Sequence, residues 1–271
     1  MKDFMPRNVL ALVCLLVATG AAAQTAPHVV TIPLSRPGEP IFLEIDILSA
    51  RIEVIGEDRD DAEFEITTVD SRRKIITPSG TKALTGGSFA FDIEEKDNEI
   101  SVATDHRIEK VTVIARVPRR ADLSLSTVND GEIVVRNITG TLELGNANGP
   151  VTASGINGPV IAESINDTID IGFASLPAEG VLSMESMNGD LIVRLPGNAG
   201  VELHLDSSEG EILSDFEVEV LPSTPVIERE DSGDGVSVRV ENTIVARVNG
   251  GGPVVRLKTL NGDISILEAG D

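Results

Sequence analysis

The sequence predicts an all-β protein built as a single-chain β-solenoid, a right-handed parallel β-helix-like coil with about 18 residues per coil. Three observations predict this class. Short stretches of alternating apolar residues fill the chain, a nine-residue repeat occupies its centre, and no long segment has the apolar spacing of a helix. Strand-rich parts flank the repeat on both sides.

Residues 1–23 predict an export signal. Lys2 and Arg7 precede an apolar run over residues 9–18, and Ala21-Ala22-Ala23 forms a small-residue cleavage site. We therefore expect cleavage before Gln24 and a periplasmic or extracellular location. The run is too short for a spanning helix and no later segment is longer, so we expect no transmembrane segment in the mature chain. A retained membrane anchor is the less favoured alternative.

The composition limits the classes of partner. Cys14, the only cysteine, lies in the signal, so the mature chain has no disulfide and no thiol chemistry. The net charge is −22 for the whole chain, and loss of Lys2, Arg7 and Asp3 makes it about −23. Such a surface repels nucleic acid, and it repels anionic lipid unless divalent cations bridge the two. The absence of Trp and Tyr argues against an aromatic glycan-binding platform.

The N-terminal region, residues 24–120, is predicted to be β-strands continuous with the solenoid. "GEDRDDAE" (56–63) is a charged turn, and 71–87 is a basic, loop-like stretch. The alternating segments predict strands at Phe42–Leu48, Arg51–Ile55, Ala62–Thr68, Ser88–Glu94, Glu99–Thr104 and Lys110–Val117.

The solenoid core is predicted at residues 121–215, where turn residues recur every nine positions. The unit reads apolar-Asn-Gly-x-apolar-x-apolar, and two units make one coil. Looser copies follow at 187–195 and 209–212, and a strong copy at 260–266 ends the chain. The first five turn positions are Gly131, Gly140, Gly149, Gly158 and Asp167.

Asn-Gly between apolar strands is typical of a two-residue hairpin, but the parity is wrong for one. In Ala147-Asn148-Gly149-Pro150-Val151 the apolar residues would fall on opposite faces of a hairpin. We predict corners instead, with the apolar residues on both sides facing one interior and with glycine supplying a positive φ that Asn also tolerates. The predicted structural turn residues are Asn129, Gly131, Gly140, Asn148, Gly149, Asn157, Gly158, Asn166, Asp167, Asn188, Gly189, Asn261 and Gly262.

The C-terminal region, residues 216–271, is predicted to be a loop followed by closing strands. Residues 221–235 are rich in proline and charge. "NGGGP" (249–253) precedes a strand, whereas a phosphate-binding loop precedes a helix. The predicted strands are Val236–Val240, Thr243–Val248 and Val254–Thr259.

Four stretches, "VPRRADLSLSTVNDGEIVV", "ESMNGDLIVRLP", "GEILSDF" and "NGGGPVVRLKTLNGDISI", resemble the bacterial "putative adhesin" domain family of unknown function. The resemblance covers nearly all of the mature chain, and the C-terminal motif is fairly specific. It implies a β-solenoid fold and an envelope location. It brings no ligand and no catalytic residues, and this chain lacks the membrane segment of tethered members.

No residue set predicts catalysis or a cofactor. His28, His106 and His204 are far apart in the sequence, and no nucleophile elbow, zinc motif or phosphate loop occurs. We expect no catalytic, cofactor-binding or metal-binding residues. One alternative is a polysaccharide-active enzyme that uses a carboxylate pair on a β-helix.

A second alternative is a calcium-stabilised structural module. Asp130, Asp167, Asp190 and Asp263 recur at turns, and residues 57–61 form an acidic cluster. The glycine and aspartate register of calcium-binding nonapeptides is missing, which favours structural turns and a solvated charged turn. The sequence thus favours a non-catalytic exported envelope protein that binds a protein or a surface polymer.

Overall fold

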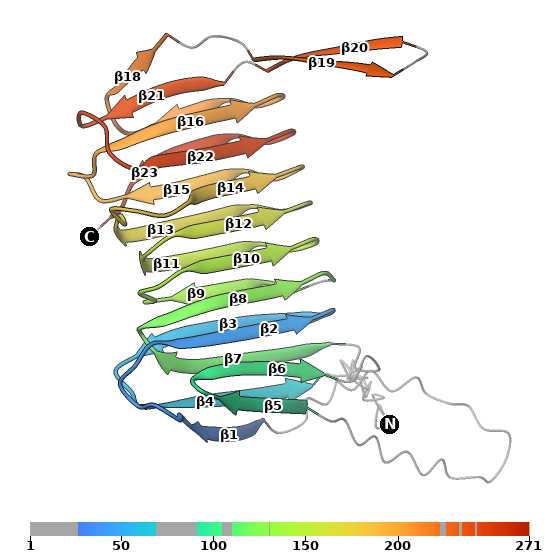
Figure 1. Cartoon of the computed structure of the whole chain (residues 1–271), viewed down its shortest axis with the longest axis vertical. Coiled ribbons are helices and arrows are strands. Elements are labelled where there is room, and N and C mark those ends of the chain that lie inside the picture. Colours follow the sequence, from blue (N-terminus) through green and yellow to red (C-terminus); the bar gives the residue numbers. More distant parts are fainter. Residues whose placement is uncertain are drawn as a thin grey trace, which may run out of the picture.

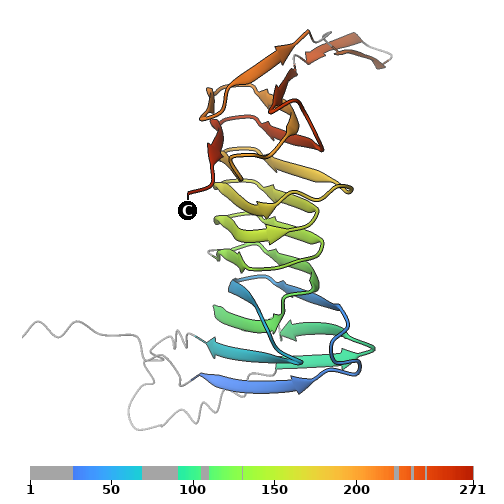
Figure 2. The same ribbon diagram turned by 90° about the vertical axis from the view of Figure 1, so that its left-hand side faces the viewer.

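The computed structural model describes residues 27–68, 91–104, 110–129, 131–222, 226–232, 235–241 and 243–270. All regular structure in these residues is β, with two large mixed sheets and one hairpin, which confirms the predicted all-β class. The predicted signal at 1–23, the basic stretch at 71–87, His106 and Asp130 lie outside the described residues. Figures 1 and 2 show the two large sheets facing each other along a tall stack.

In the residues that the structure describes, sheet I has eleven strands, sheet II has ten, and a separate hairpin has two. Sheet I is, in spatial order, β18 (Val218–Leu221), β21 (Ile244–Val248), β16 (Val201–Ser207), β22 (Val254–Thr259), β14 (Leu182–Ser186), β12 (Val160–Ser164), β10 (Leu142–Asn146), β8 (Ala121–Thr127), β2 (Ile41–Ile47), β6 (Glu99–Thr104) and β5 (Phe91–Lys96). Sheet II is β1 (His28–Pro33), β4 (Asp61–Thr68), β7 (Val111–Pro118), β3 (Ala50–Glu57), β9 (Ile133–Arg136), β11 (Val151–Asn157), β13 (Ile169–Ser175), β15 (Leu191–Leu195), β23 (Ile264–Glu268) and β17 (Ile212–Ser214). The hairpin is β19 (Val226–Ser232) with β20 (Gly235–Glu241).

The chain passes from one large sheet to the other at each Asn-Gly of the centre, from sheet I to sheet II at Asn148-Gly149 and back to sheet I at Asn157-Gly158. We call a strand of sheet I and the sheet II strand that follows it a rung. Neighbouring rungs pair in parallel, with Leu142 opposite Val160 in sheet I and Val151 opposite Ile169 in sheet II, each eighteen positions apart. Asn148-Gly149 joins β10 to β11, which belong to different sheets, so the corner interpretation is confirmed over the hairpin.

The space between the sheets is filled by one continuous apolar core. Each strand alternates buried and outward residues, as period-two patterning requires. Because the rungs are in register, apolar residues of the same position lie one above another, and each fully buried side chain contributes about 1.5–3 kcal/mol. One such column is Leu123, Leu142, Val160, Leu182 and Val255.

The apolar residues at the two corners of a rung point in different directions. This corrects the prediction that the apolar residues on both sides of every corner face the interior. Where β9 and β11 leave sheet II, Asn137 (φ 57°) and Gly155 (φ 67°) shift the alternation by one residue, so Ile138 and Ile156 point inward. Where the strands of sheet I end, no such residue intervenes. The apolar residue before the Asn, for example Ile165, is therefore on the outside.

The predicted reason for the corner glycines was wrong. Gly131, Gly149, Gly158, Gly189 and Gly262 do not have positive φ. Each lies so close to the neighbouring rung that a Cβ would overlap a backbone carbonyl oxygen there, so glycine is required by close approach. Asp167 occupies this position in rung β12–β13, and rung β2–β3 also turns without a glycine, at Leu48-Ser49.

The order of the rungs differs from their order in the sequence at both ends. Rung β2–β3 lies between β6–β7 and β8–β9, and rung β22–β23 lies between β14–β15 and β16–β17. The last strong copy of the repeat, residues 260–266, is therefore an internal layer of the stack. Antiparallel strands β1, β4 and β5 end the stack on one side, and β21 and β18 end sheet I on the other.

We expect Gly149→Ala to lower the free energy of unfolding by about 1–3 kcal/mol, because the added methyl group overlaps the carbonyl oxygen of Gly131. The matched control is Gly145→Ala on the same strand pair, where a Cβ meets no atom within 4 Å. The control is expected to change stability by no more than about 0.5 kcal/mol. Urea denaturation measures both, and equal stabilities of the two variants would contradict the close-approach explanation.

Candidate binding surface

An apolar stripe runs along the edge of sheet I where its strands turn toward sheet II. Backbone hydrogen bonds hold its members in register: Val128 N–H donates to the Leu48 carbonyl (3.2 Å) and Asn188 N–H to the Ile165 carbonyl (2.8 Å). The larger members have exposed fractions between 38% for Val128 and 55% for Leu48. This corner stripe consists of Leu48, Val128, Ala147, Ile165, Met187 and Leu260.

Asparagine side chains form a ladder beside the corner stripe. The Nδ2 of Asn166 donates to Oδ1 of Asn148 (2.8 Å), and Nδ2 of Asn188 donates to Oδ1 of Asn166 (2.9 Å). Asn261 extends the ladder through its bond to Asn188 (2.8 Å), and Asn148 ends it on the Val128 carbonyl (2.8 Å). The predicted turn asparagines therefore link rungs, and none of these four has a positive φ.

Small polar residues lie directly beneath the stripe at the ends of the same strands. The Thr127 Oγ1 accepts from Ala50 N–H (3.2 Å), Asn146 Nδ2 donates to the Gly131 carbonyl (3.1 Å) and Thr259 Oγ1 donates to the Gly189 carbonyl (2.9 Å). These bonds satisfy backbone groups that the corner removes from the sheet ladder. The corner backbone beneath the stripe is thus held by side chains.

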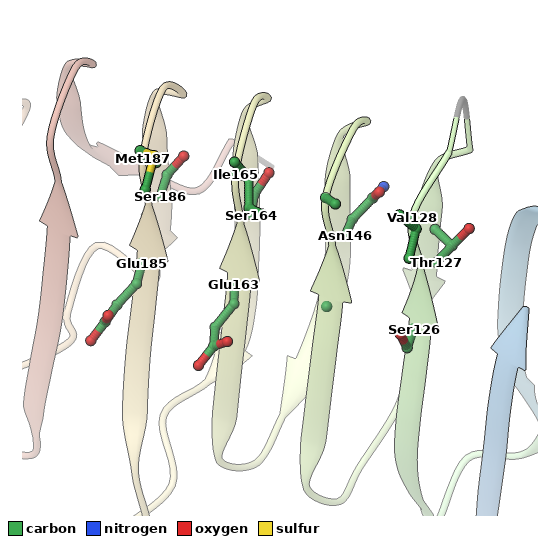
Figure 3. Close-up of a pocket in the computed structure, with 12 residues that line it drawn as sticks. Ser126, Thr127, Val128, Asn146, Glu163, Ser164, Ile165, Glu185, Ser186 and Met187 are labelled. Carbon is green, nitrogen blue, oxygen red and sulfur yellow. The ribbon is translucent and has the colours of Figure 1, made fainter. Parts of the chain in front are cut away.

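A shallow groove of about 440 Å³ opens along this edge, lined by four neighbouring rungs. In Figure 3, Val128, Ile165 and Met187 lie near the corner, and Glu163 and Glu185 project lower on the strands. The small residues Ser126 and Gly145 at the level of the two glutamates leave the groove open there.

Carboxylates follow the stripe on the outer face of sheet I. Asp46, Glu163 and Glu185 each precede a stripe residue by two positions, so they point to the same face. Glu163 and Glu185 are direct neighbours in register, a like-charge arrangement that destabilises a sheet. On the other side of Glu185, Lys258 of β22 is in register with it and also lies 4.0 Å from Asp206.

The outer face of sheet II carries several paired carboxylates. Arg116 lies 3.2 Å from Glu63, and Arg194 forms two hydrogen bonds to Asp170, which raise the pKa of Arg194. Arg136 and Arg51 both contact carboxylates of neighbouring strands. Sheet I has such a pair as well, since Lys258 lies 4.0 Å from Asp206.

The two described histidines, His28 and His204, lie on different sheets. His204 on β16 lies 3.1 Å from Glu202, which also accepts from Arg247 (3.1 Å). Hydrogen bonds from His204 and then from Arg247 lower the pKa of Glu202. His28 lies on β1, the end strand of sheet II, whereas β16 lies near the opposite end of the stack in sheet I. The two histidines are therefore far apart.

The turn aspartates accept backbone hydrogen bonds. Asp190 Oδ1 accepts from Asp263 N–H (2.9 Å), Asp263 Oδ1 from Glu211 N–H (2.8 Å) and Asp167 Oδ1 from Thr168 N–H (2.8 Å). In residues 57–61, Arg59 lies between Glu57 (3.3 Å) and Asp61 (2.7 Å). The described residues contain no group of three or more acidic, His or Cys side chains that could hold a metal ion.

The predicted turn residues lie at the corners, and the stripe was missed. Asn129 and Gly131 join β8 to β9, Gly140 joins β9 to β10, and Asn157 and Gly158 join β11 to β12. The remaining predicted pairs lie between β10 and β11, β12 and β13, β14 and β15, and β22 and β23. The sequence signal for the stripe is the apolar residue before each Asn. The repeat pattern predicted that this residue faces the interior, so the stripe was missed.

Several solved bacterial structures are similar to this chain. A structure from Clostridium sporogenes described as a "putative cell adhesion protein" shares 11% identity and a TM-score of 0.41, covering 90% of this chain and 100% of that one. A "putative adhesin" from Bacteroides fragilis shares 10% identity and a TM-score of 0.41, covering 90% and 97%. One from Parabacteroides distasonis shares 13% identity and a TM-score of 0.32, covering 92% and 98%.

These descriptions are of the same kind as the family that the sequence motifs resemble. No protein-family model and no curated protein matches the chain. Among the residues that the structure describes, no helix is long and apolar enough to cross a membrane.

We expect a chelator to leave the melting temperature unchanged, because Asp190 and Asp263 bind backbone N–H groups. Thermal unfolding is followed by circular dichroism in calcium and in EDTA at equal ionic strength. A ligand that binds only the folded state raises the melting temperature. A rise in calcium that EDTA reverses would therefore contradict this expectation and support the calcium-stabilised alternative.

Proposed function

We propose that this chain is a non-catalytic, exported cell-envelope protein whose rungs form a β-solenoid and whose corner stripe binds an envelope partner. The partner is a protein or a surface polymer of the periplasm or the cell surface. The observation that carries the proposal is the corner stripe itself: adjacent apolar residues exposed on a strongly acidic protein. Contiguous exposed apolar surface of this kind marks interaction sites.

The solenoid interpretation is supported by the parallel register of the rungs and by the passage between sheets at each corner. Such a stack presents one long face on which a repeated residue becomes a continuous surface. The Asn ladder lies beside the stripe and the buried polar residues lie beneath it, and hydrogen bonds of both sets hold the backbone of the stripe in place. A surface held in this way is pre-organised for binding, which reduces the entropy lost when a partner docks.

The enzyme alternative has less support. A glycosidase needs two carboxyl groups with different environments, one of them with a raised pKa. Glu163 and Glu185 are both exposed and occupy equivalent positions on adjacent strands. Glu163 and Glu185 therefore do not form an acid and a base with distinct environments.

The export part of the proposal predicts a defined mature end. We expect the full chain, expressed in a Gram-negative host, to be recovered from the periplasm or the medium with Gln24 as its first residue, since Ala21-Ala22-Ala23 is the cleavage site. Cell fractionation and intact-mass measurement test this. Retention in the inner membrane with residues 1–23 attached would contradict it and support an anchored form.

The binding part predicts cross-links at the stripe. With a photo-reactive amino acid at Met187, we expect defined adducts in the envelope fraction of the producing bacterium, since this side chain is half exposed in the groove. The matched control places the same amino acid at Thr152 on the outer face of sheet II, which is also exposed. Equal adducts at both positions, or none at Met187, would contradict the proposal. Turnover on a polysaccharide panel that is lost in Glu163→Gln would replace it with the enzyme alternative.

A further inference from the structure

The geometry points to a particular partner: we propose that the corner stripe and the carboxylates beside it bind a cationic amphipathic α-helix of another protein. This inference rests on the proposed function, because it names the chemistry of the partner for the same surface. Three features carry it, namely the charge beside the stripe, the spacing of the rungs, and the distance between the apolar and acidic rows.

The charge selects a cationic partner. Glu163 and Glu185 lie side by side on the groove, and the row beside the stripe holds three carboxylates, Asp46, Glu163 and Glu185, against one cation, Lys258, which is in register with Glu185. Lysine or arginine side chains of a partner would relieve the repulsion between these two carboxylates. A second copy of this chain would bring more negative charge to the same face, since each copy carries a net charge of −22.

The length of the stripe suits a helix. Its six members lie on the adjacent rungs of β2, β8, β10, β12, β14 and β22, which span about 24 Å at the usual strand separation. A helix of about 16 residues covers this distance. Its pitch of about 5.4 Å is close to the strand separation of about 4.8 Å, so apolar residues three or four positions apart meet successive rungs. On an extended strand, side chains of one face repeat at about 6.6 Å and fall out of step.

The width also fits. Glu163 precedes Ile165 and Glu185 precedes Met187 by two strand positions, which places each carboxylate about 6.6 Å along the strand from its apolar neighbour. A helix lying on the stripe would direct lysines at the border of its apolar face toward this row. Ser126 and Gly145 leave space on the acidic side of the stripe, where the bodies of these side chains would lie.

The test uses a synthetic peptide of about 18 residues made of leucine and lysine at helical spacing, labelled for fluorescence anisotropy. We expect saturable binding in a one-to-one ratio that weakens as salt is raised. Two comparison peptides separate the contributions. One has the same composition in an order that abolishes the apolar face, and the other has glutamate in place of lysine. Each is expected to bind at least about tenfold more weakly.

Matched variants locate the peptide on the protein. Met187→Lys and Glu163→Gln/Glu185→Gln are each expected to weaken binding by about tenfold. Leu213→Lys on β17 is the control for the first, since Leu213 is exposed to a similar extent (50% against 51%). Glu219→Gln on β18 is the control for the second, because Glu219 is also exposed. Thermal unfolding of each variant shows that the fold is kept.

Two results would overturn the inference: equal binding of the peptide that lacks an apolar face, or equal losses in the stripe variants and their controls. Either would mean that the peptide binds by charge alone or elsewhere. Failure of the peptide together with cross-linking at Met187 in the envelope fraction would reject the cationic helix and leave the proposed function intact. If the peptide does not bind and no cross-link forms at Met187, both the cationic helix and the proposed function are rejected.

Discussion

The direct contact between the backbones of adjacent rungs at their corners is the constraint on which the rest of the structure depends. At Gly149 and Gly189 the chain lies against the carbonyl oxygen of the neighbouring rung, without room for a Cβ. Parallel strands alone permit a sliding register wherever side chains are similar. A corner that fits only glycine removes this freedom, so the rungs that meet at these glycines have one register.

A fixed register converts each position of the repeat into a column. Inward positions give the stacked core, positions at the strand end give the buried polar residues, and the position before the Asn gives the corner stripe. The Asn ladder has the same origin, since Asn148, Asn166, Asn188 and Asn261 are brought within hydrogen-bond distance only if the rungs are aligned. The candidate binding surface is therefore a consequence of the fold and not an addition to it.

The sequence could predict most of the strands, the corners and the absence of a hairpin at the central Asn-Gly pairs, because all three follow from local patterns of two and nine residues. It could not predict which corner turns its apolar residue inward. That choice depends on the positive φ of Asn137 and Gly155, and the repeat pattern does not mark these two residues. The sequence also could not predict that β22–β23 lies between β14–β15 and β16–β17. Rungs with equivalent patterns can pair in several orders, and contacts between residues distant in sequence decide which order forms. The stripe was visible as a repeated apolar residue, but its exposure follows from the corner geometry.

The arrangement of charged side chains beside the stripe indicates what kind of partner it would bind. Both sheets have the same backbone arrangement and share one core, so stability alone does not require their surfaces to differ. Sheet II pairs charges across strands, as at Arg194 and Asp170, and sheet I does so at Arg247 and Glu202, but beside the stripe sheet I places Glu163 next to Glu185. An arrangement that costs stability in the free protein becomes favourable only when opposite charge is supplied from outside. The apolar stripe lies along these carboxylates, so one cationic amphipathic partner would contact both rows at once.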